Sequence, residues 1–290
     1  DRLRPVSLTA GRRANMVPGT ATLIIAAPEH SLDAMKERLD RAARVAGHAL
    51  APPEFEVSLA GKSGTETTFE IVFHGKPAHG AYPSRGRNAA IDALAFIGAA
   101  QEPDSPLERF AAFLVKTLAA TDGSGLNLHA RAPGLGKTTA SLGVLELRED
   151  GGSALMDVRF PFGLTVKEVE RTIREVAESA ARDAPGFTVA SSLEGRAQEP
   201  LFVDPEEHPE FIRGLQVAYG LATGREPELR TISGTTYAKA FPLAVSFGPI
   251  DNSVGDVQLG HEVDEKIPVE RHLENIRIYA AALAILACGA

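Results

Sequence analysis

The segment Phe73–Leu94 constrains this chain most, because it places a polar turn rich in glycine and proline between a strand and a helix. Before the turn, residues Thr67–Phe73 are β-branched and aromatic with loose alternation, which predicts a strand with one buried face. After it, Asn88 can cap a helix whose apolar residues recur at helical spacing. The prolines stiffen the turn and its glycines allow a tight path, so we expect His79 on a rigid loop, where a working imidazole is usually held. These residues alone fit a surface histidine in an ordinary turn equally well.

Composition excludes several classes of function. The 290 residues are 44% hydrophobic and 23% charged, as in an ordinary globular protein of one or two domains. The net charge is −8 and the 30 basic residues are spread along the chain, which argues against a nucleic-acid partner. No cationic start with an apolar run marks a signal peptide or a membrane span, and the single Cys288 cannot form an internal disulfide. We therefore expect a cytoplasmic protein.

Two successive sets of strands and helices are predicted before residue 200. The first has strands at 6–8, 21–27, 55–59 and 67–73, with helices at 32–46 and from Asn88. The second, after a helix at 107–120, has strands at 140–147, 154–160 and 187–192 and a helix at 166–181. This order predicts an α+β domain of antiparallel sheet and helices at residues 15–198. The segment 134–138 is similar to a phosphate-binding loop, but Arg131 stands where that loop requires glycine.

Residues 199–290 predict an α/β fold. Asp204–Glu207 is a good helix start, with Asp as cap and acids against the helix dipole. The paired carboxylates of Glu206 and Glu207 could bridge metals, but their favourable interaction with the helix dipole is sufficient to explain their presence. A strand, a small-residue turn and a short helix follow at 229–240, and then a strand at 244–247 and a last helix at 269–287. These strand–turn–helix units are typical of α/β domains, here only in part.

Several motifs together resemble the co-catalytic zinc exopeptidases, a family of aminoacylases, succinyl-diaminopimelate desuccinylases and bacterial dipeptidases. The turn residues 75–83 (GKPAHGAYP) and 86–89 (GRNA) are similar to the signature of that family's lid domain. Residues 233–238 (SGTTYA), 244–249 (AVSFGP) and 261–265 (HEVDE) look like the end of the PepV-type dipeptidase branch. The resemblance implies that residues 1–14 end an N-terminal catalytic segment and lead into the lid, that 15–198 form an enlarged lid, and that 199–290 are the C-terminal part of the catalytic domain.

The resemblance also implies roles for individual residues. His79 takes the position of the lid histidine, which donates to the oxyanion of the tetrahedral intermediate. Asn15 matches the asparagine of the segment that leads into the lid. Arg159, in the run Asp157–Pro161, matches an arginine that grips the substrate carboxylate; without the resemblance it is an exposed strand residue paired with Asp157. The turn at Gly234 and Thr235 would lie against the same carboxylate.

His261 takes the position of a zinc ligand in the resemblance, which implies two zinc ions in the intact enzyme, with other divalent metals as alternatives. Its acidic neighbours could orient its second ring nitrogen, although an exposed histidine beside carboxylates is commonplace. The family also needs an N-terminal His-x-Asp, a bridging Asp and a Glu-Glu pair. None of the eight histidines here begins a His-x-Asp. We therefore expect this chain to be inactive by itself, as a fragment of a longer enzyme or as a degenerate relative.

Three functional hypotheses follow. The leading one is the lid and C-terminal catalytic portion of a zinc-dependent dipeptidase that hydrolyses short peptides with a metal-activated water. A second keeps the fold but takes N-acyl amino acids or N-succinyl-diaminopimelate, which need the same carboxylate grip. A third is a non-catalytic binding or assembly protein. The enlarged lid favours a monomeric active site, and a dimer is the alternative.

Overall fold

The chain forms two compact units, Asp1–Pro200 and Leu201–Ala290, in a computed structural model. The structure describes residues 3–28, 33–37, 40, 53–100, 106–128, 136–182, 188–193, 197–232, 236–248 and 266–288. The division between the units falls two residues from the boundary expected at 198. Within residues 1–14, expected to end the N-terminal catalytic segment and to lead into the lid, Arg4–Ala10 forms a strand of the first unit's sheet.

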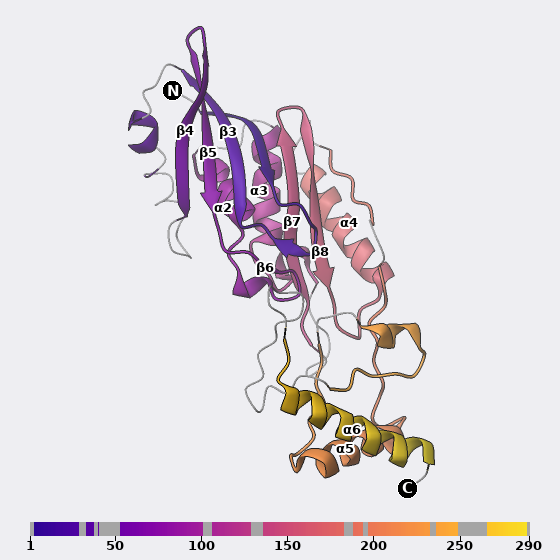
Figure 1. The fold of residues 1–290 in the computed structure, drawn as a ribbon. Helices are drawn as coiled ribbons and strands as arrows, with labels where there is room; N and C mark the ends of the chain where they lie inside the picture. Colours follow the sequence, from indigo (N-terminus) through magenta and orange to yellow (C-terminus); the bar gives the residue numbers. More distant parts are fainter. Residues whose placement is uncertain are drawn as a thin grey trace. The chain divides into compact units, whose positions relative to one another are not determined.

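The first unit is built on an antiparallel sheet with the strand order β4-β5-β3-β1-β7-β8 among the described residues (Figure 1). The strand from the chain's start, β1, lies at the centre of the sheet between β3 and β7. It thereby joins the two sets of strands that the sequence predicted separately. The strands are β1 (Arg4–Ala10), β3 (Thr20–Pro28), β4 (Glu54–Ser63), β5 (Glu66–His74), β7 (Thr139–Arg148) and β8 (Gly151–Arg159).

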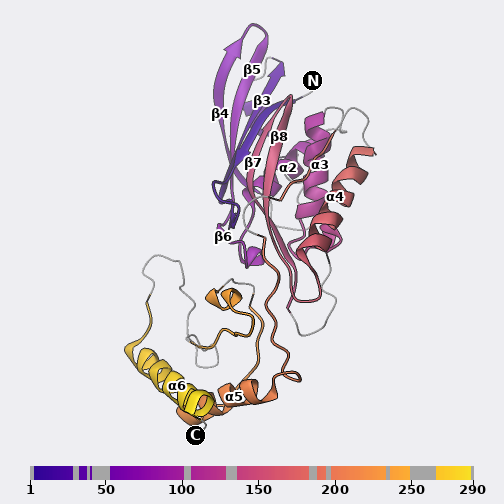
Figure 2. The same cartoon turned by 90° about the vertical axis from the view of Figure 1, so that its right-hand side faces the viewer.

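Alternation along the strands gives the sheet one buried and one open face. In β5, Thr67, Phe69, Ile71 and Phe73 are buried, while the residues between them are only half-buried. Three helices lie on the buried side: α2 (Ala89–Ala100), α3 (Pro106–Leu118) and α4 (Val166–Arg182) (Figure 2). The helices close a hydrophobic core between themselves and the sheet.

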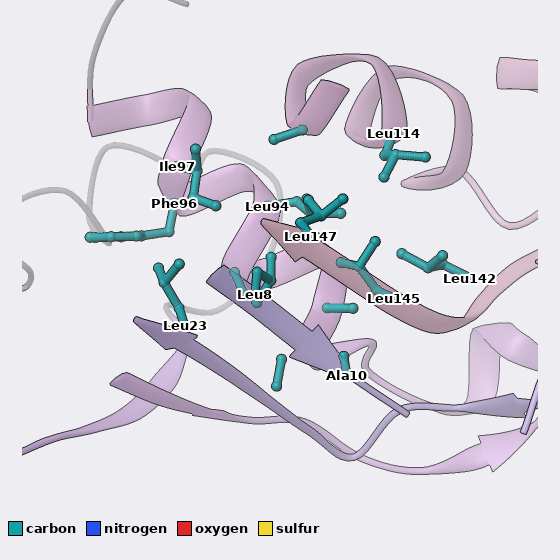
Figure 3. Packing of buried hydrophobic residues seen from close by; sticks show 14 of the residues in the cluster. Leu8, Ala10, Leu23, Leu94, Phe96, Ile97, Leu114, Leu142, Leu145 and Leu147 are labelled. Carbon is teal, nitrogen blue, oxygen red and sulfur yellow. The ribbon is translucent and has the colours of Figure 1, made fainter. Parts of the chain in front are cut away.

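The core takes side chains from strands far apart in the sequence. Leu8, Leu23 and Leu147 meet Leu94, Phe96 and Leu114 of the helices (Figure 3). Because β1 and β3 come from the start of the chain and β7 from its middle, this packing joins both predicted strand–helix sets into one unit. The hydrophobic core extends to the edge strand β8 through the half-buried side chains of Met156 and Val158.

Three expected strands are not formed in the described residues. The segments 188–192, 229–232 and 244–247 carry no strand there, which corrects the sequence interpretation. For the segments 229–232 and 244–247, the described residues of the second unit offer no partner strand, and a strand needs backbone hydrogen bonds from a neighbour. Ile232, in the second of these segments, is 56% exposed. The α/β content expected for residues 199–290 is therefore not seen in the described part of that unit.

The second unit is built on two helices, α5 (Pro209–Thr223) and α6 (Val269–Cys288), which pack against each other. The helix α5 begins at Pro209, after the expected start at Asp204–Glu207. That segment forms a separate turn, in which the His208 amide donates to the Asp204 carbonyl at 3.0 Å. Arg225 binds both carboxylate oxygens of Glu274, at 3.1 and 2.8 Å, and so joins the end of α5 to α6. In the described part of the chain, no helix is both long and apolar enough to cross a membrane.

Candidate functional site

A small ribbon of two short strands presents His79. The strand β2 (Met16–Val17) pairs antiparallel with β6 (Ala78–His79), so that Met16 lies opposite His79. The Gly80 amide donates to the Asn15 carbonyl at 2.7 Å and extends the pairing. Further along the turn, Lys76 and Arg87 exchange two backbone hydrogen bonds of 2.9 and 2.8 Å. The turn that carries His79 is therefore held by backbone hydrogen bonds on both sides.

A backbone hydrogen bond orients the His79 ring. The Ala81 amide donates to Nδ1 of His79 at 3.1 Å, and the side chain is half-buried. Since Nδ1 accepts a hydrogen bond, the neutral ring carries its proton on Nε2. In this tautomer Nε2 is the hydrogen-bond donor of the ring, and an oxyanion donor needs such an N–H group.

Asn88 performs the capping role predicted for it and a second one. Its Oδ1 accepts from the amides of Ala90 and Ile91 at 3.0 and 3.4 Å, at the start of α2. Its Nδ2 donates to the Leu142 carbonyl of β7 at 2.8 Å. The same residue thus ends the His79 loop, begins the helix and ties both to the sheet.

The ribbon lies against the open face of the sheet where β7 and β8 pair. Gly143 is the extra residue of a β-bulge in β7, and a Cβ there would collide with the backbone of Ala14, just before the ribbon. A Cβ at Gly80 would lie 2.5 Å from Oδ2 of Asp157 in β8. Two glycines therefore allow the close approach, and neither was singled out from the sequence for that reason. A glycine inside a strand was the available signal for Gly143.

Arg159 ends β8 on the same face as Asp157. Its Nε lies 3.3 and 3.2 Å from the two carboxylate oxygens of Asp157, and its Nη2 lies 2.9 Å from Oδ2. The ion pair expected from the residues alone is present. The Arg159 side chain is 20% exposed, so it is more buried than an ordinary edge-strand arginine.

The structure brings together the segments that carry three of the six predicted site residues. Asn15 precedes β2, His79 ends β6 and Arg159 ends β8, and the Gly80–Asp157 approach joins the ribbon to β8. Asn15 is exposed and contributes its backbone carbonyl to the ribbon. Gly234, Thr235 and His261 lie outside the described residues. Asp157 is the functional candidate that the sequence interpretation used only as a partner of Arg159.

The described residues do not gather a metal-binding set. Among them, no three His, Cys, Asp or Glu side chains lie close enough together to hold a metal ion. Glu206, considered as a bridging carboxylate, lies in the turn before α5, where its amide binds Oδ1 of Asp204 at 2.8 Å. This backbone contact agrees with a structural role for the acidic pair.

We expect the close approach at Gly143 to be sensitive to a single methyl group. Gly143→Ala should destabilise the first unit by about 1–3 kcal/mol, because its Cβ needs the backbone of Ala14 to move. Gly98→Ala is the matched control, since Gly98 lies in α2 with no neighbour around its Cβ position. There the change should stabilise the unit by up to about 1 kcal/mol. Urea unfolding of both variants measures the change in the free energy of unfolding. Equal changes would contradict the close contact between Ala14 and Gly143 of β7.

The chain is similar to several bacterial proteins over nearly all of its length. It is 27% identical over 286 residues to "Putative dipeptidase YtjP" of Bacillus subtilis, covering 97% of this chain and 55% of that protein. It is 26% identical over 280 residues to a "Putative dipeptidase" of Staphylococcus saprophyticus, covering 96% and 54%. A third protein of that name, from Staphylococcus aureus, is 26% identical over 287 residues, with 96% and 55% covered. The chain thus spans about half the length of these curated relatives.

No family model matches the chain. The similarity to dipeptidase-named proteins covers both compact units, so it includes the His79 ribbon, β8 and the α5–α6 pair.

Proposed function

We propose that this chain supplies the lid and the C-terminal catalytic portion of a zinc-dependent dipeptidase. The observation that carries the proposal is the ribbon of His79 held against the Asp157–Arg159 pair, in a chain similar to dipeptidase-named proteins over 97% of its length. A hydrogen-bond donor on this ribbon and a guanidinium bound to the carboxylate that packs against Gly80 suit a substrate that has a scissile carbonyl and a terminal carboxylate. A short peptide has both groups.

In this proposal His79 and Arg159 act on different parts of one substrate. The Nε2 hydrogen of His79 donates to the carbonyl oxygen as negative charge develops on it, so its contribution grows toward the transition state. Arg159 binds the terminal carboxylate before and during the reaction, so it contributes to substrate binding throughout. Asn15 lies next to His79 in the candidate site, because its backbone carbonyl accepts a hydrogen bond from the Gly80 amide. We further propose that the chain uses its own His79 in a monomeric active site.

Zinc enters the proposal through the family resemblance, with His261 as the candidate ligand. The donor set of the described residues does not fit a metal site. We derive no catalytic step through a metal. None of the eight histidines begins the His-x-Asp that the family resemblance requires, so we propose that the remaining metal ligands and the general base lie outside this sequence. It follows that the 290-residue chain should neither bind zinc tightly nor hydrolyse peptides.

The test compares this chain with the protein translated from the complete reading frame that contains it. The longer protein should hydrolyse dipeptides and lose activity with a chelator, while the 290-residue chain should show neither turnover with added zinc, manganese or cobalt nor a tight zinc site by calorimetry. Chelator-sensitive turnover by the pure chain would contradict this division of the catalytic groups. Preference for N-acetyl amino acids or N-succinyl-diaminopimelate over dipeptides would favour the second hypothesis, and binding without turnover of any of these would favour the third.

A further inference from the structure

Asp157 makes two contacts that belong to different parts of the candidate site. Its carboxylate receives hydrogen bonds from Nε and Nη2 of Arg159, the shortest being 2.9 Å. The same Oδ2 atom packs against the backbone of Gly80, where a Cβ would be only 2.5 Å away. Gly80 follows His79 directly and is buried. A single carboxylate therefore touches both the arginine and the ribbon that carries the histidine.

The environment of this ion pair differs from that of exposed pairs elsewhere in the unit. The Asp157 and Arg159 side chains are 14% and 20% exposed, whereas Arg174 and Glu170 of α4 are 54% and 37% exposed. Across the sheet, Asp157 lies opposite Ser141, which is itself buried. Exposed pairs hold their side chains weakly, because water competes for both charges. A pair covered by the ribbon keeps a fixed geometry, since its charged groups have little water to turn toward.

We propose that Asp157 is a positioning residue that holds the Arg159 guanidinium at a fixed distance from His79. The consequence for catalysis rests on the proposed function, but the contact itself does not. If His79 meets the scissile carbonyl and Arg159 meets the terminal carboxylate, then the spacing between them selects substrates by the separation of those two groups. Asp157 thus favours dipeptides over longer peptides by fixing that spacing.

The first measurement concerns the 290-residue chain and needs no activity. The Nε–Hε signal of Arg159 should be ordered in the unmodified chain and should become mobile in Asp157→Ala, with an order parameter below about 0.6. Asp157→Asn keeps the shape and one acceptor oxygen, so it should give an intermediate result and guards against a failure of the alanine variant to fold. Glu170→Gln, which breaks the exposed pair with Arg174, should leave Arg159 unchanged. An Arg159 signal that is equally mobile with and without Asp157 would overturn the proposal.

The second measurement uses the longer protein and tests whether Asp157 acts through Arg159. Asp157→Ala should raise KM for a dipeptide by about tenfold or more, and the double variant Asp157→Ala/Arg159→Ala should be no worse than Arg159→Ala alone. A merely structural role would instead lower activity by the same factor in both backgrounds, and that result would overturn the positioning role. Asp157→Ala should also lower the ratio of kcat/KM for dipeptides to kcat/KM for tripeptides. If Arg159 becomes mobile but neither substitution alters kinetics, the positioning contact stands and the proposed function fails.

Discussion

Replacing His79 with alanine in the longer protein should lower kcat by about a hundredfold or more, the scale for loss of one oxyanion donor. The expectation follows from the ring geometry. The Ala81 amide donates to Nδ1, so the neutral ring carries its proton on Nε2, the atom that we propose donates to the developing negative charge. KM should change little, because the interaction is made chiefly in the transition state. Steady-state kinetics on a dipeptide measure both parameters.

Conservative substitutions at this position distinguish the donor from a general effect of the loop. Glutamine places its side-chain amide near the position of Nε2, and asparagine places it near Nδ1. His79→Gln should therefore retain more of kcat than His79→Asn. Comparable activity of the two variants would contradict the assigned ring proton.

His74→Ala is the matched histidine control. His74 ends β5, five residues earlier, with its Nε2 3.5 Å from Glu56, and it takes no part in the ribbon. Its substitution should leave kcat unchanged. Arg159→Ala should instead raise KM more than it lowers kcat, as loss of uniform substrate binding does. If His79→Ala and His74→Ala behaved alike, the oxyanion role would be wrong.

Phe73→Ala should destabilise the first unit by about 3–5 kcal/mol, the range for an aromatic side chain removed from a core. Phe73 is fully buried, and its ring centroid lies 5.9 Å from that of Phe55 and 5.7 Å from that of Phe96. It therefore links two strands to α2 directly beside the His79 loop. Such a loss is a large part of the roughly 5–15 kcal/mol by which whole proteins are stable. Urea unfolding followed by circular dichroism gives the change.

Val72→Thr is the control on the opposite face of the same strand. Val72 is half-buried, and threonine keeps the β-branched shape that suits a strand. The substitution should cost less than about 1 kcal/mol. Equal costs at positions 72 and 73 would contradict the assignment of the buried face.

Local patterns predicted most strands and helices of the first unit, but they predicted a strand at 188–192 that is not formed and missed the pairing of β2 with β6. The alternation in β5, the cap at Asn88 and the glycine–proline turn between them are properties of neighbouring residues, so they can be read along the chain. The strands of the second unit were predicted wrongly by the same reasoning. Apolar runs such as that around Ile232 favour a strand only if another strand accepts their hydrogen bonds, and the described residues there include none.

The sequence by itself predicted the glycine–proline turn that carries His79 and the cap at Asn88, because backbone preferences and capping act within a few residues. The roles of His79, Asn15 and Arg159 rest on the family resemblance and stay predictions. Only the tertiary structure decided that β1 lies between β3 and β7, which brings β8 beside a ribbon formed by residues 16–17 and 78–79. It also decided that Asp157 meets Gly80. That contact joins residues far apart in the chain, and it depends on the absence of a side chain at Gly80 and on the bulge at Gly143, neither of which has a periodic signal. Packing between distant segments selects such approaches, whereas local propensity does not distinguish them.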